Sequence, residues 1–364
     1  MRLHYLDNLR ALAMLAGVLF HAALAYSPLI HPYWPPADRS PSQLVDLFVW
    51  FLHLFRMPLF FMIAGYFAAE LIERRGMSGL MRNRARRILI PFAALLVPII
   101  FSLSWSTQWA AANVQHPSPV LQWLREFSAQ SNPPQLPPST SHLWFLYYLV
   151  WFYVLLWALR VLLPENLRRL PERLPRWWIA IAPMLLAPAL ASVVAPHPAP
   201  ESFVPQFWAI AFFGAFFAFG AAAHRHREWI DALSPVWLAS IGVLLYGLWF
   251  VLLRHAMIDP ANPRAPWSLA ILGAYISVLM TLACWVAGRR WLNAQSRVMR
   301  YLAGGSYWTY LLHLPLLFLA QYVLMDLSWH WSLKFAIAVF ATLLLCYLSY
   351  ELLIRRTELR RFVG

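Results

Sequence analysis

An arginine and a histidine near the start of the chain have the residue types and the spacing that chemistry needs. Arg10 and His21 are separated by ten residues that carry neither charge nor proline. On a helix, this spacing returns His21 to within roughly 20° of the Arg10 face, about 16 Å further along the axis. Histidine transfers protons near neutral pH, and arginine binds anions. A helical histidine is also a common hydrogen-bonded packing residue, so its surroundings decide between the two roles.

The composition places these two residues in a membrane. Of the 364 residues, 61% are hydrophobic and only 12% are charged, whereas a typical soluble domain has about 25% charged residues. Apolar stretches of about 20 residues recur along the whole length. We therefore predict an all-α polytopic membrane protein in which residues 1–364 form a single domain. An ionisable side chain inside a membrane is costly, which favours a functional role for His21.

Ten transmembrane helices account for the apolar stretches, and their arginines predict an orientation. The predicted segments are 9–30, 43–71, 87–107, 141–162, 177–196, 203–223, 234–254, 266–287, 303–324 and 333–354. Arginines cluster after the even-numbered segments and beside the first, whereas the alternate connections hold few basic residues. The positive-inside rule then predicts cytoplasmic N- and C-termini. This topology accounts for most of the net charge of +14, so we predict contact with membrane lipids and no nucleic-acid partner.

The longest outward connection, 108–140, contains four prolines between Asn132 and Pro138. Proline at this density excludes regular structure from the second half of the connection. A connection of this length covers a site, binds a ligand or simply joins two helices. The sequence leaves these three interpretations open.

The second predicted segment carries two polar side chains near its middle. His53 and Arg56 are three residues apart and share one face of a helix, which Pro58 loosens beside them. An unpaired guanidinium at mid-membrane costs at least about 2.5–3.5 kcal/mol. Arg56 therefore faces a polar cavity or an anion, or it forms an internal ion pair. The candidate partners for such a pair are Asp7, Asp46 and Glu351.

Two more arginines follow this segment on the predicted cytoplasmic side. Arg84 and Arg87 are three residues apart on a helix end, shortly before Pro91. An arginine pair at a membrane surface suits phosphate groups, and lipid headgroups are the plain alternative ligand. Within the segment, Gly65 permits close helix approach.

Other segments also carry polar residues that chemistry uses. His142 begins the fourth segment, with Trp144 close behind it; His313 lies in the ninth, and Glu351 lies near the cytoplasmic end of the tenth. No pair of these histidines has the spacing of a metal site, and no carboxylate cluster accompanies them, so we predict no metal. Acid–base chemistry matches isolated histidines better.

The motifs that contain these residues resemble the membrane acyltransferase-3 superfamily. They are Leu6-Asp7-x-Leu9-Arg10-x10-His21, Phe60-Phe61-x3-Gly65-Tyr66-Phe67 and Arg84-x2-Arg87-x3-Pro91. Within the superfamily, the chain is most similar to the succinyltransferases of osmoregulated periplasmic glucans. The residues of this closer similarity are His53-x2-Arg56-Met57, Ser141-His142-Leu143-Trp144-Phe145-Leu146, His313-x-Pro315-Leu316 and Tyr350-Glu351.

The resemblance implies a ten-helix enzyme of the bacterial inner membrane. Such an enzyme takes succinyl from cytoplasmic succinyl-CoA, its co-substrate, and places it on a hydroxyl of a periplasmic glucan, with no permanently bound cofactor. His21 would be the general base, and Arg10 and Asp7 would assist in the catalytic site. The rise of about 16 Å between Arg10 and His21 is of the order of an extended pantetheine arm.

The residue types, taken together with this resemblance, suggest roles for the remaining candidates. Arg84 and Arg87 would bind the phosphates of CoA. Arg56, helped by His53, would read the carboxylate that distinguishes succinyl from acetyl. The residues expected to bind or support the acceptor are His142, Trp144, His313 and Glu351.

Two alternative functions remain open at this point. The first is an O-acetyltransferase that uses acetyl-CoA on a cell-surface or periplasmic polysaccharide, because such enzymes share much of the pattern. The second belongs to another class: a glucan or small-molecule transporter whose histidines relay protons. The apparent absence of inverted repeats in the sequence speaks against the transporter.

Overall fold

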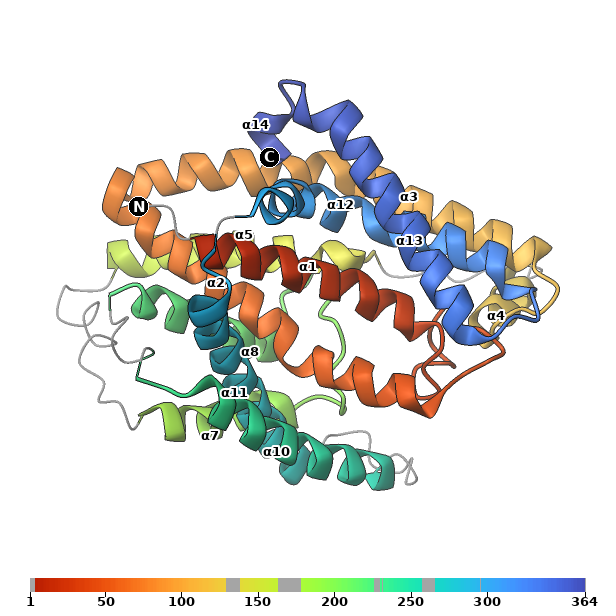
Figure 1. Ribbon diagram of the computed structural model, residues 1–364, viewed down its shortest axis with the longest axis horizontal. Coiled ribbons are helices and arrows are strands. Elements are labelled where there is room, and N and C mark those ends of the chain that lie inside the picture. Colours follow the sequence, from red (N-terminus) through yellow and green to blue (C-terminus); the bar gives the residue numbers. More distant parts are fainter. Residues whose placement is uncertain are drawn as a thin grey trace. The chain divides into compact units, whose positions relative to one another are not determined.

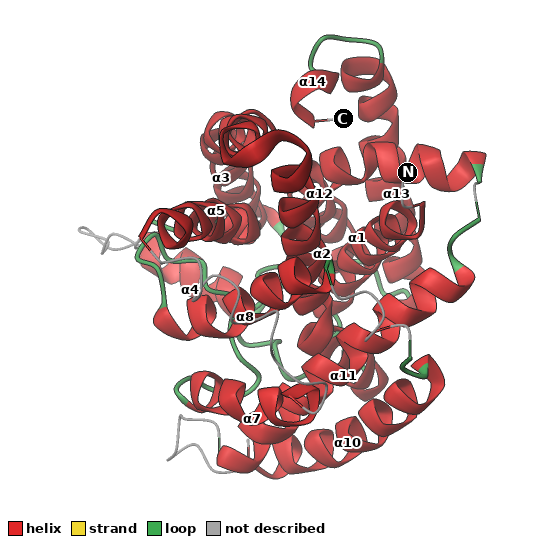
Figure 2. Cartoon of the chain, turned by 90° about the vertical axis from the view of Figure 1, so that its left-hand side faces the viewer, coloured by secondary structure: helices red, strands yellow, loops and turns green. Residues whose placement is uncertain are grey.

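The described part of the chain is almost entirely helical. The computed structural model describes residues 4–128, 138–162, 178–225, 230, 232–256, 266–294 and 296–363. These residues form helices joined by loops and no β-strand (Figures 1 and 2). The proline-rich half of the outward connection, 129–137, and the basic connections 163–177 and 226–229 lie outside the described residues.

The main helices coincide with the predicted segments. Their bounds are α1 His4–Leu24, α2 Gln43–Arg84, α3 Ile90–Asn113, α4 Pro119–Ser128, α5 Trp144–Leu162, α7 Trp178–Ala191, α8 Phe207–Ala223, α10 Pro235–Ala256, α11 Trp267–Trp291, α12 Arg297–Met325, α13 Trp331–Ser349 and α14 Arg360–Val363. Every predicted segment overlaps one of them. The expectation of an all-α architecture is therefore confirmed for the described residues.

Seven helical stretches of the described chain are long and apolar enough to cross a membrane. One of them, Gln43–Asn113, includes both the second and the third predicted segment. The fifth and sixth predicted segments correspond to shorter apolar helices, Ala180–Ala191 and Phe207–Ala223. The chain is thus a multi-pass membrane protein.

Helix α2 is interrupted at one glycine. Gly76 has φ 67° and ψ 179°, a backbone conformation that side chains with a Cβ rarely adopt. A π-helical turn, Ala85–Leu89, then leads directly into α3. Helix α2 therefore continues past the kink to its last residue, Arg84, and the π-helical turn that follows holds Arg87.

The chain divides into two compact units, each built from three separate segments. Unit 1 comprises residues 1–10, 54–89 and 144–296, and unit 2 comprises residues 11–53, 90–143 and 297–364. Helices α1 and α2 each contribute residues to both units. The expectation of a single domain remains a prediction.

In unit 1, the second half of α2 packs directly on α8. A Cβ at Gly65 would lie 1.9 Å from the carbonyl oxygen of Phe217, and a Cβ at Gly220 would lie 1.9 Å from that of Met62. The two backbones therefore touch at both glycines, and no larger residue fits at either position. The close approach expected at Gly65 is confirmed.

Unit 2 is organised around α12. This helix packs against α3 and α13, and an apolar cluster that includes Ala22, Leu121, Phe318 and Tyr322 joins them to α4 and the end of α1. At the other end of α12, Gly305 lies against Tyr347, since a Cβ there would meet that ring at 2.7 Å. The packing fixes α12 beside the last turns of α1, where His21 lies.

Candidate active site

Two of the predicted histidines meet in unit 2. His21 on α1 and His313 on α12 are 292 residues apart in sequence, and their side chains are joined by a hydrogen bond of 2.9 Å between His21 Nδ1 and His313 Nε2. His313 is fully buried, with 1% of its surface exposed, while His21 is partly exposed. The pair therefore has one protected member and one that a substrate can reach.

When both rings are neutral, the hydrogen bonds of His313 define their tautomers. His313 Nδ1 lies 2.7 Å from the carbonyl oxygen of Tyr310 and 3.1 Å from that of Thr309. Carbonyl oxygens only accept, so Nδ1 carries the proton and Nε2 is an acceptor. His21 Nδ1 must then donate to His313. This leaves the proton of His21 on Nδ1 and a lone pair on its Nε2, the form that a general base requires.

A third histidine is positioned by the proline of the same helix. Pro315 has no N–H, so the carbonyl of Leu311, four residues earlier, lacks its helical donor. His142 Nε2 lies 3.2 Å from that oxygen and donates to it. Its ring meets the His313 ring edge-on at 5.2 Å, and the Tyr310 hydroxyl donates to the His142 carbonyl at 2.8 Å. The three histidines thus form one cluster: His21, His142 and His313.

Aromatic rings surround the partly exposed His21. The Trp34 ring is parallel to it, at 2° and a centroid separation of 6.4 Å, and Phe20 meets it edge-on at 5.2 Å. His53, on the first part of α2, stacks on Phe20 at 5.8 Å and also contacts Trp50. His53 therefore belongs to the same aromatic wall, one ring further from His21.

Sequence reasoning missed Trp34. This residue lies in the connection between α1 and α2, where neither periodicity nor a motif distinguishes it from other tryptophans. The only available signal was its place in a connection predicted to face outward, thirteen residues after His21.

The arginine candidates of the N-terminal segments lie in unit 1. Asp7 and Arg10 form an i,i+3 ion pair of 3.6 Å at the start of α1, and Asn8 between them donates to the Leu292 carbonyl at 2.7 Å. Arg56 is buried, with 8% of its surface exposed. Arg10 and His21 lie on one continuous helix, as their spacing predicts.

Arg84 directly precedes an irregular helical turn, and Arg87 lies within it. Arg84 ends α2 and its guanidinium lies over the Tyr153 ring, 5.2 Å from the centroid. Arg87 lies in the π-helical turn and is exposed. π-Helical turns are rare and occur frequently at functional sites. An exposed guanidinium beside a second one is able to bind a polyanion, and no buried ion pair has to break for this.

Trp144 and Glu351 have contacts of a structural kind. Trp144 packs among the rings of Phe61, Tyr148 and Phe213 in unit 1. Glu351, in unit 2, lies in the π-helical turn Tyr350–Arg355 and accepts from Arg355 at 2.8 Å and from Arg356 at 3.2 Å. Their roles in acceptor binding remain predictions.

Comparison with known proteins identifies the family of this chain. The sequence profile of the acyltransferase domain of family 3 matches residues 3–351. The chain belongs to the acyltransferase-3 family. Curated relatives include glucans biosynthesis protein C of Salmonella gallinarum, which is 26% identical over 349 residues, covering 90% of this chain and 85% of the relative. The proteins of the same name from Salmonella paratyphi B and Salmonella heidelberg match at the same identity and coverage. No solved structure matches the chain.

Membership of the acyltransferase-3 family gives the histidine cluster a chemical context. A membrane acyltransferase that acts on a hydroxyl needs a base to activate it, and His21, the predicted base, is the partly exposed member of the cluster. The family profile covers every candidate residue, from Asp7 to Glu351. The role of each individual residue is a matter for experiment.

Proposed function

We propose that this protein moves succinyl from cytoplasmic succinyl-CoA to hydroxyl groups of a periplasmic glucan. The observation that carries the proposal is the hydrogen bond between His21 and His313, because with both rings neutral it supports a proton on His21 Nδ1 and a basic Nε2. The name of the Salmonella relatives supports a glucan as the acceptor. Transport would not require a histidine held in one tautomer beside a second, buried histidine.

The chemistry proceeds in two proton transfers. His21 Nε2 takes the proton of the glucan hydroxyl as its oxygen attacks the thioester carbonyl carbon, and a C–O bond forms. The C–S bond then breaks, and the CoA thiolate receives the proton from the His21 imidazolium. The products are a glucan ester and free CoA thiol. His313 Nε2 accepts from His21 Nδ1 throughout, so it orients the ring and stabilises its positive charge.

The donor is held by arginines that the positive-inside rule predicts to be cytoplasmic. Arg84 and Arg87 bind the CoA phosphates, and Asp7 fixes Arg10 through their ion pair near the start of α1. Along α1, Arg10 and His21 are separated by a rise of about 16 Å, which matches the reach of an extended pantetheine arm. The nucleotide thus remains at the surface while the thioester reaches the level of His21.

Arg56 provides the preference for succinyl. Arg56 is buried, and succinyl carries a terminal carboxylate, which acetyl lacks and which a guanidinium binds through charged hydrogen bonds. His53 shares the Arg56 face of α2 and assists it. The complete enzyme has ten transmembrane helices in the bacterial inner membrane, with both termini cytoplasmic.

The test of this proposal is thiol release from purified protein in detergent. Succinyl-CoA and acetyl-CoA are supplied with and without periplasmic glucan extracted from Salmonella, and wild type is compared with His21→Ala. We expect glucan-dependent release that favours succinyl-CoA and falls by about 10³-fold in the variant. Full activity of His21→Ala would overturn the mechanism, and equal use of both donors would indicate an acetyltransferase.

Arg56→Leu tests the donor preference separately. Loss of one charged hydrogen bond should reduce the preference for succinyl-CoA over acetyl-CoA by about 10- to 100-fold, because only the succinyl chain loses a contact. Arg56→Lys, which keeps the charge, is the matched control and should retain most of the preference. An equal loss of activity with both donors would make Arg56 a structural residue.

A further inference from the structure

Trp34 combines two features that point to a ligand. Its ring is parallel to that of His21 and meets Phe318 edge-on at 5.3 Å, so it lies at the partly exposed side of the histidine pair. Its indole Nε1 is buried and has no hydrogen-bond partner among the described residues. A buried donor without a partner costs about 1–3 kcal/mol, and such groups are rare unless a ligand or water uses them.

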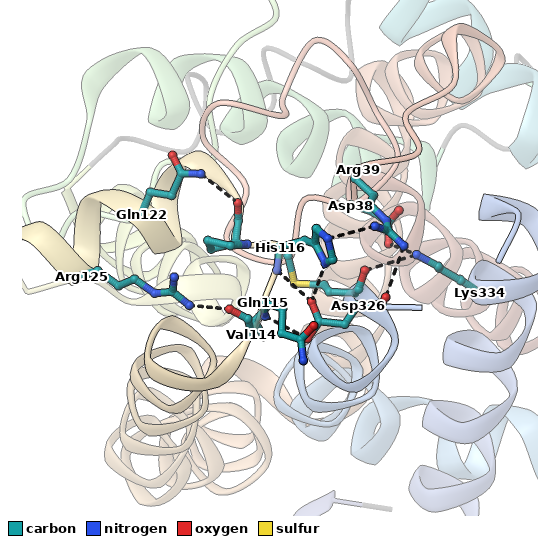
Figure 3. A network of polar contacts seen from close by, with 11 residues as sticks. Asp38, Arg39, Val114, Gln115, His116, Gln122, Arg125, Asp326 and Lys334 are labelled. Atoms are coloured by element: carbon teal, nitrogen blue, oxygen red, sulfur yellow. Dashed lines mark hydrogen bonds and ion pairs between the residues drawn. The ribbon is translucent and has the colours of Figure 1, made fainter. Parts of the chain in front are cut away.

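The connection that carries Trp34 is fixed on both sides. The Trp34 carbonyl accepts from Ala37 N at 3.1 Å, and the Pro35 carbonyl accepts from Ser118 Oγ at 2.6 Å. Further along, Asp38 forms an ion pair of 2.7 Å with Lys334, and both side chains are almost fully buried (Figure 3). The backbone of the connection is therefore held at Trp34 and on its C-terminal side.

A polar network on the same connection adds to this rigidity. Arg39 donates to His116 Nε2 at 3.2 Å and to the Asp326 carbonyl at 3.3 Å (Figure 3). Burial raises the pKa of Asp326, but hydrogen bonds from the backbone of Gln115 and His116 and from the His116 ring outweigh this and lower it. The Asp326 carboxylate thus binds the loop that precedes α4, and the Asp326 carbonyl binds Arg39 of the connection.

We infer that Trp34 is an acceptor-binding residue, whose indole N–H donates to an oxygen of the incoming glycan beside His21. The inference rests on the proposed function, because it assumes that His21 deprotonates a sugar hydroxyl. Trp34 lies in a connection that the arginine distribution assigns to the outward side, the side from which a periplasmic glycan arrives. Glycans present many hydroxyl and ether oxygens, each able to accept from an indole N–H.

The test measures glycan binding and chemistry separately. Purified full-length wild type, Trp34→Phe, His21→Ala and the control Trp123→Phe are titrated with periplasmic glucan extracted from Salmonella, and the Kd is measured by thermophoresis. Trp34→Phe keeps an aromatic ring but removes the N–H, and we expect its Kd to rise about tenfold. Trp123 is an exposed tryptophan of α4 in the same unit, so its replacement should leave the Kd unchanged. Thermal melting verifies that each variant is folded.

Thiol release from succinyl-CoA without glucan, where water is the acceptor, completes the design. We expect Trp34→Phe to lose more in the glucan-dependent transfer than in this hydrolysis, because the missing N–H serves the glycan. An unchanged Kd for Trp34→Phe would overturn the inference, and so would an equal loss of hydrolysis and transfer, which would indicate contact with the acyl group instead.

The same measurements separate this inference from the proposed function. If wild type binds glucan but transfers no acyl group to it, the proposed function fails, while the Kd of Trp34→Phe still supports or overturns the glycan contact. If wild type does not bind glucan at all, both proposals are overturned.

Discussion

A proline inside a helix leaves one backbone carbonyl without its helical donor. In each unit one such carbonyl accepts from a distant side chain, and the two side chains are of different kinds. In unit 2, Pro315 leaves the Leu311 carbonyl without its helical donor, and His142 donates to it. In unit 1, Pro58 does the same to the Leu54 carbonyl, and Ser277 Oγ donates to it at 2.6 Å. In both units a distant side chain replaces the missing donor, an arrangement that we call a repair. Only the unit 2 repair uses an imidazole, a group capable of acid–base chemistry.

The comparison indicates what such a gap is used for. Ser277 and Leu54 are buried in the packing of α2 on α11, where a satisfied carbonyl stabilises the fold. His142 and Leu311 lie beside His313, so the same kind of hydrogen bond also fixes the ring that packs edge-on against the buried partner of His21. The unit 1 repair is expected to affect stability alone, whereas the unit 2 repair should affect stability and activity together.

The largest effect is expected at His313 itself, the centre of the unit 2 site. His313→Leu removes the acceptor of His21 Nδ1–H, so His21 loses its fixed tautomer and the partner that stabilises its charge. We expect the rate of transfer to fall by about 10²-fold or more, as for other residues that orient a catalytic histidine. His313→Gln, whose amide oxygen is able to accept, should recover part of the rate. Equal rates in the Leu and Gln variants would contradict the proposed role.

The sequence predicted the helices far better than the partners of the site. Hydropathy identified the segments because the signal is local to 20 or so residues. The pairing of His21 with His313 depends on how α12 packs on the end of α1, across 292 residues, and no local pattern encodes it. The kink at Gly76 and the π-helical turn after it were not predicted from the sequence either, since they depend on backbone geometry.

The prolines show how much of the site the sequence alone is able to predict. A proline inside a predicted helix indicates which carbonyl is left without a donor, so the gaps at Leu54 and Leu311 follow from the sequence. The donors that fill them come from segments far away in the chain and require the tertiary structure. His142 and Ser277 are therefore understood only once the packing is known.

A smaller effect is expected when the unit 2 repair is removed. His142→Leu leaves the buried Leu311 carbonyl without a donor, which should lower the free energy of unfolding by about 1–3 kcal/mol. We also expect transfer to slow by about tenfold, because the ring that packs on His313 is lost. Thermal melting and thiol release measure the two effects on the same preparation.

Pro315→Ala provides the matching control for His142→Leu. Alanine restores an N–H at position 315, so the helix supplies its own donor to Leu311. In this background His142→Leu should cost much less stability but still slow the transfer. If stability and activity recovered together, the histidine would serve only as a repair, as in unit 1.

The smallest effect is expected at the unit 1 repair. Ser277→Ala should lower the free energy of unfolding by about 1 kcal/mol, because the Leu54 carbonyl loses the donor that replaces the missing N–H of Pro58. The transfer rate should stay unchanged, since Ser277 has no titratable partner there. In a Pro58→Ala background the helix supplies the donor, so Ser277→Ala should have almost no effect on melting. A loss of transfer in Ser277→Ala without a loss of stability would contradict the division of roles between the two units, because it would give the serine a part in the chemistry.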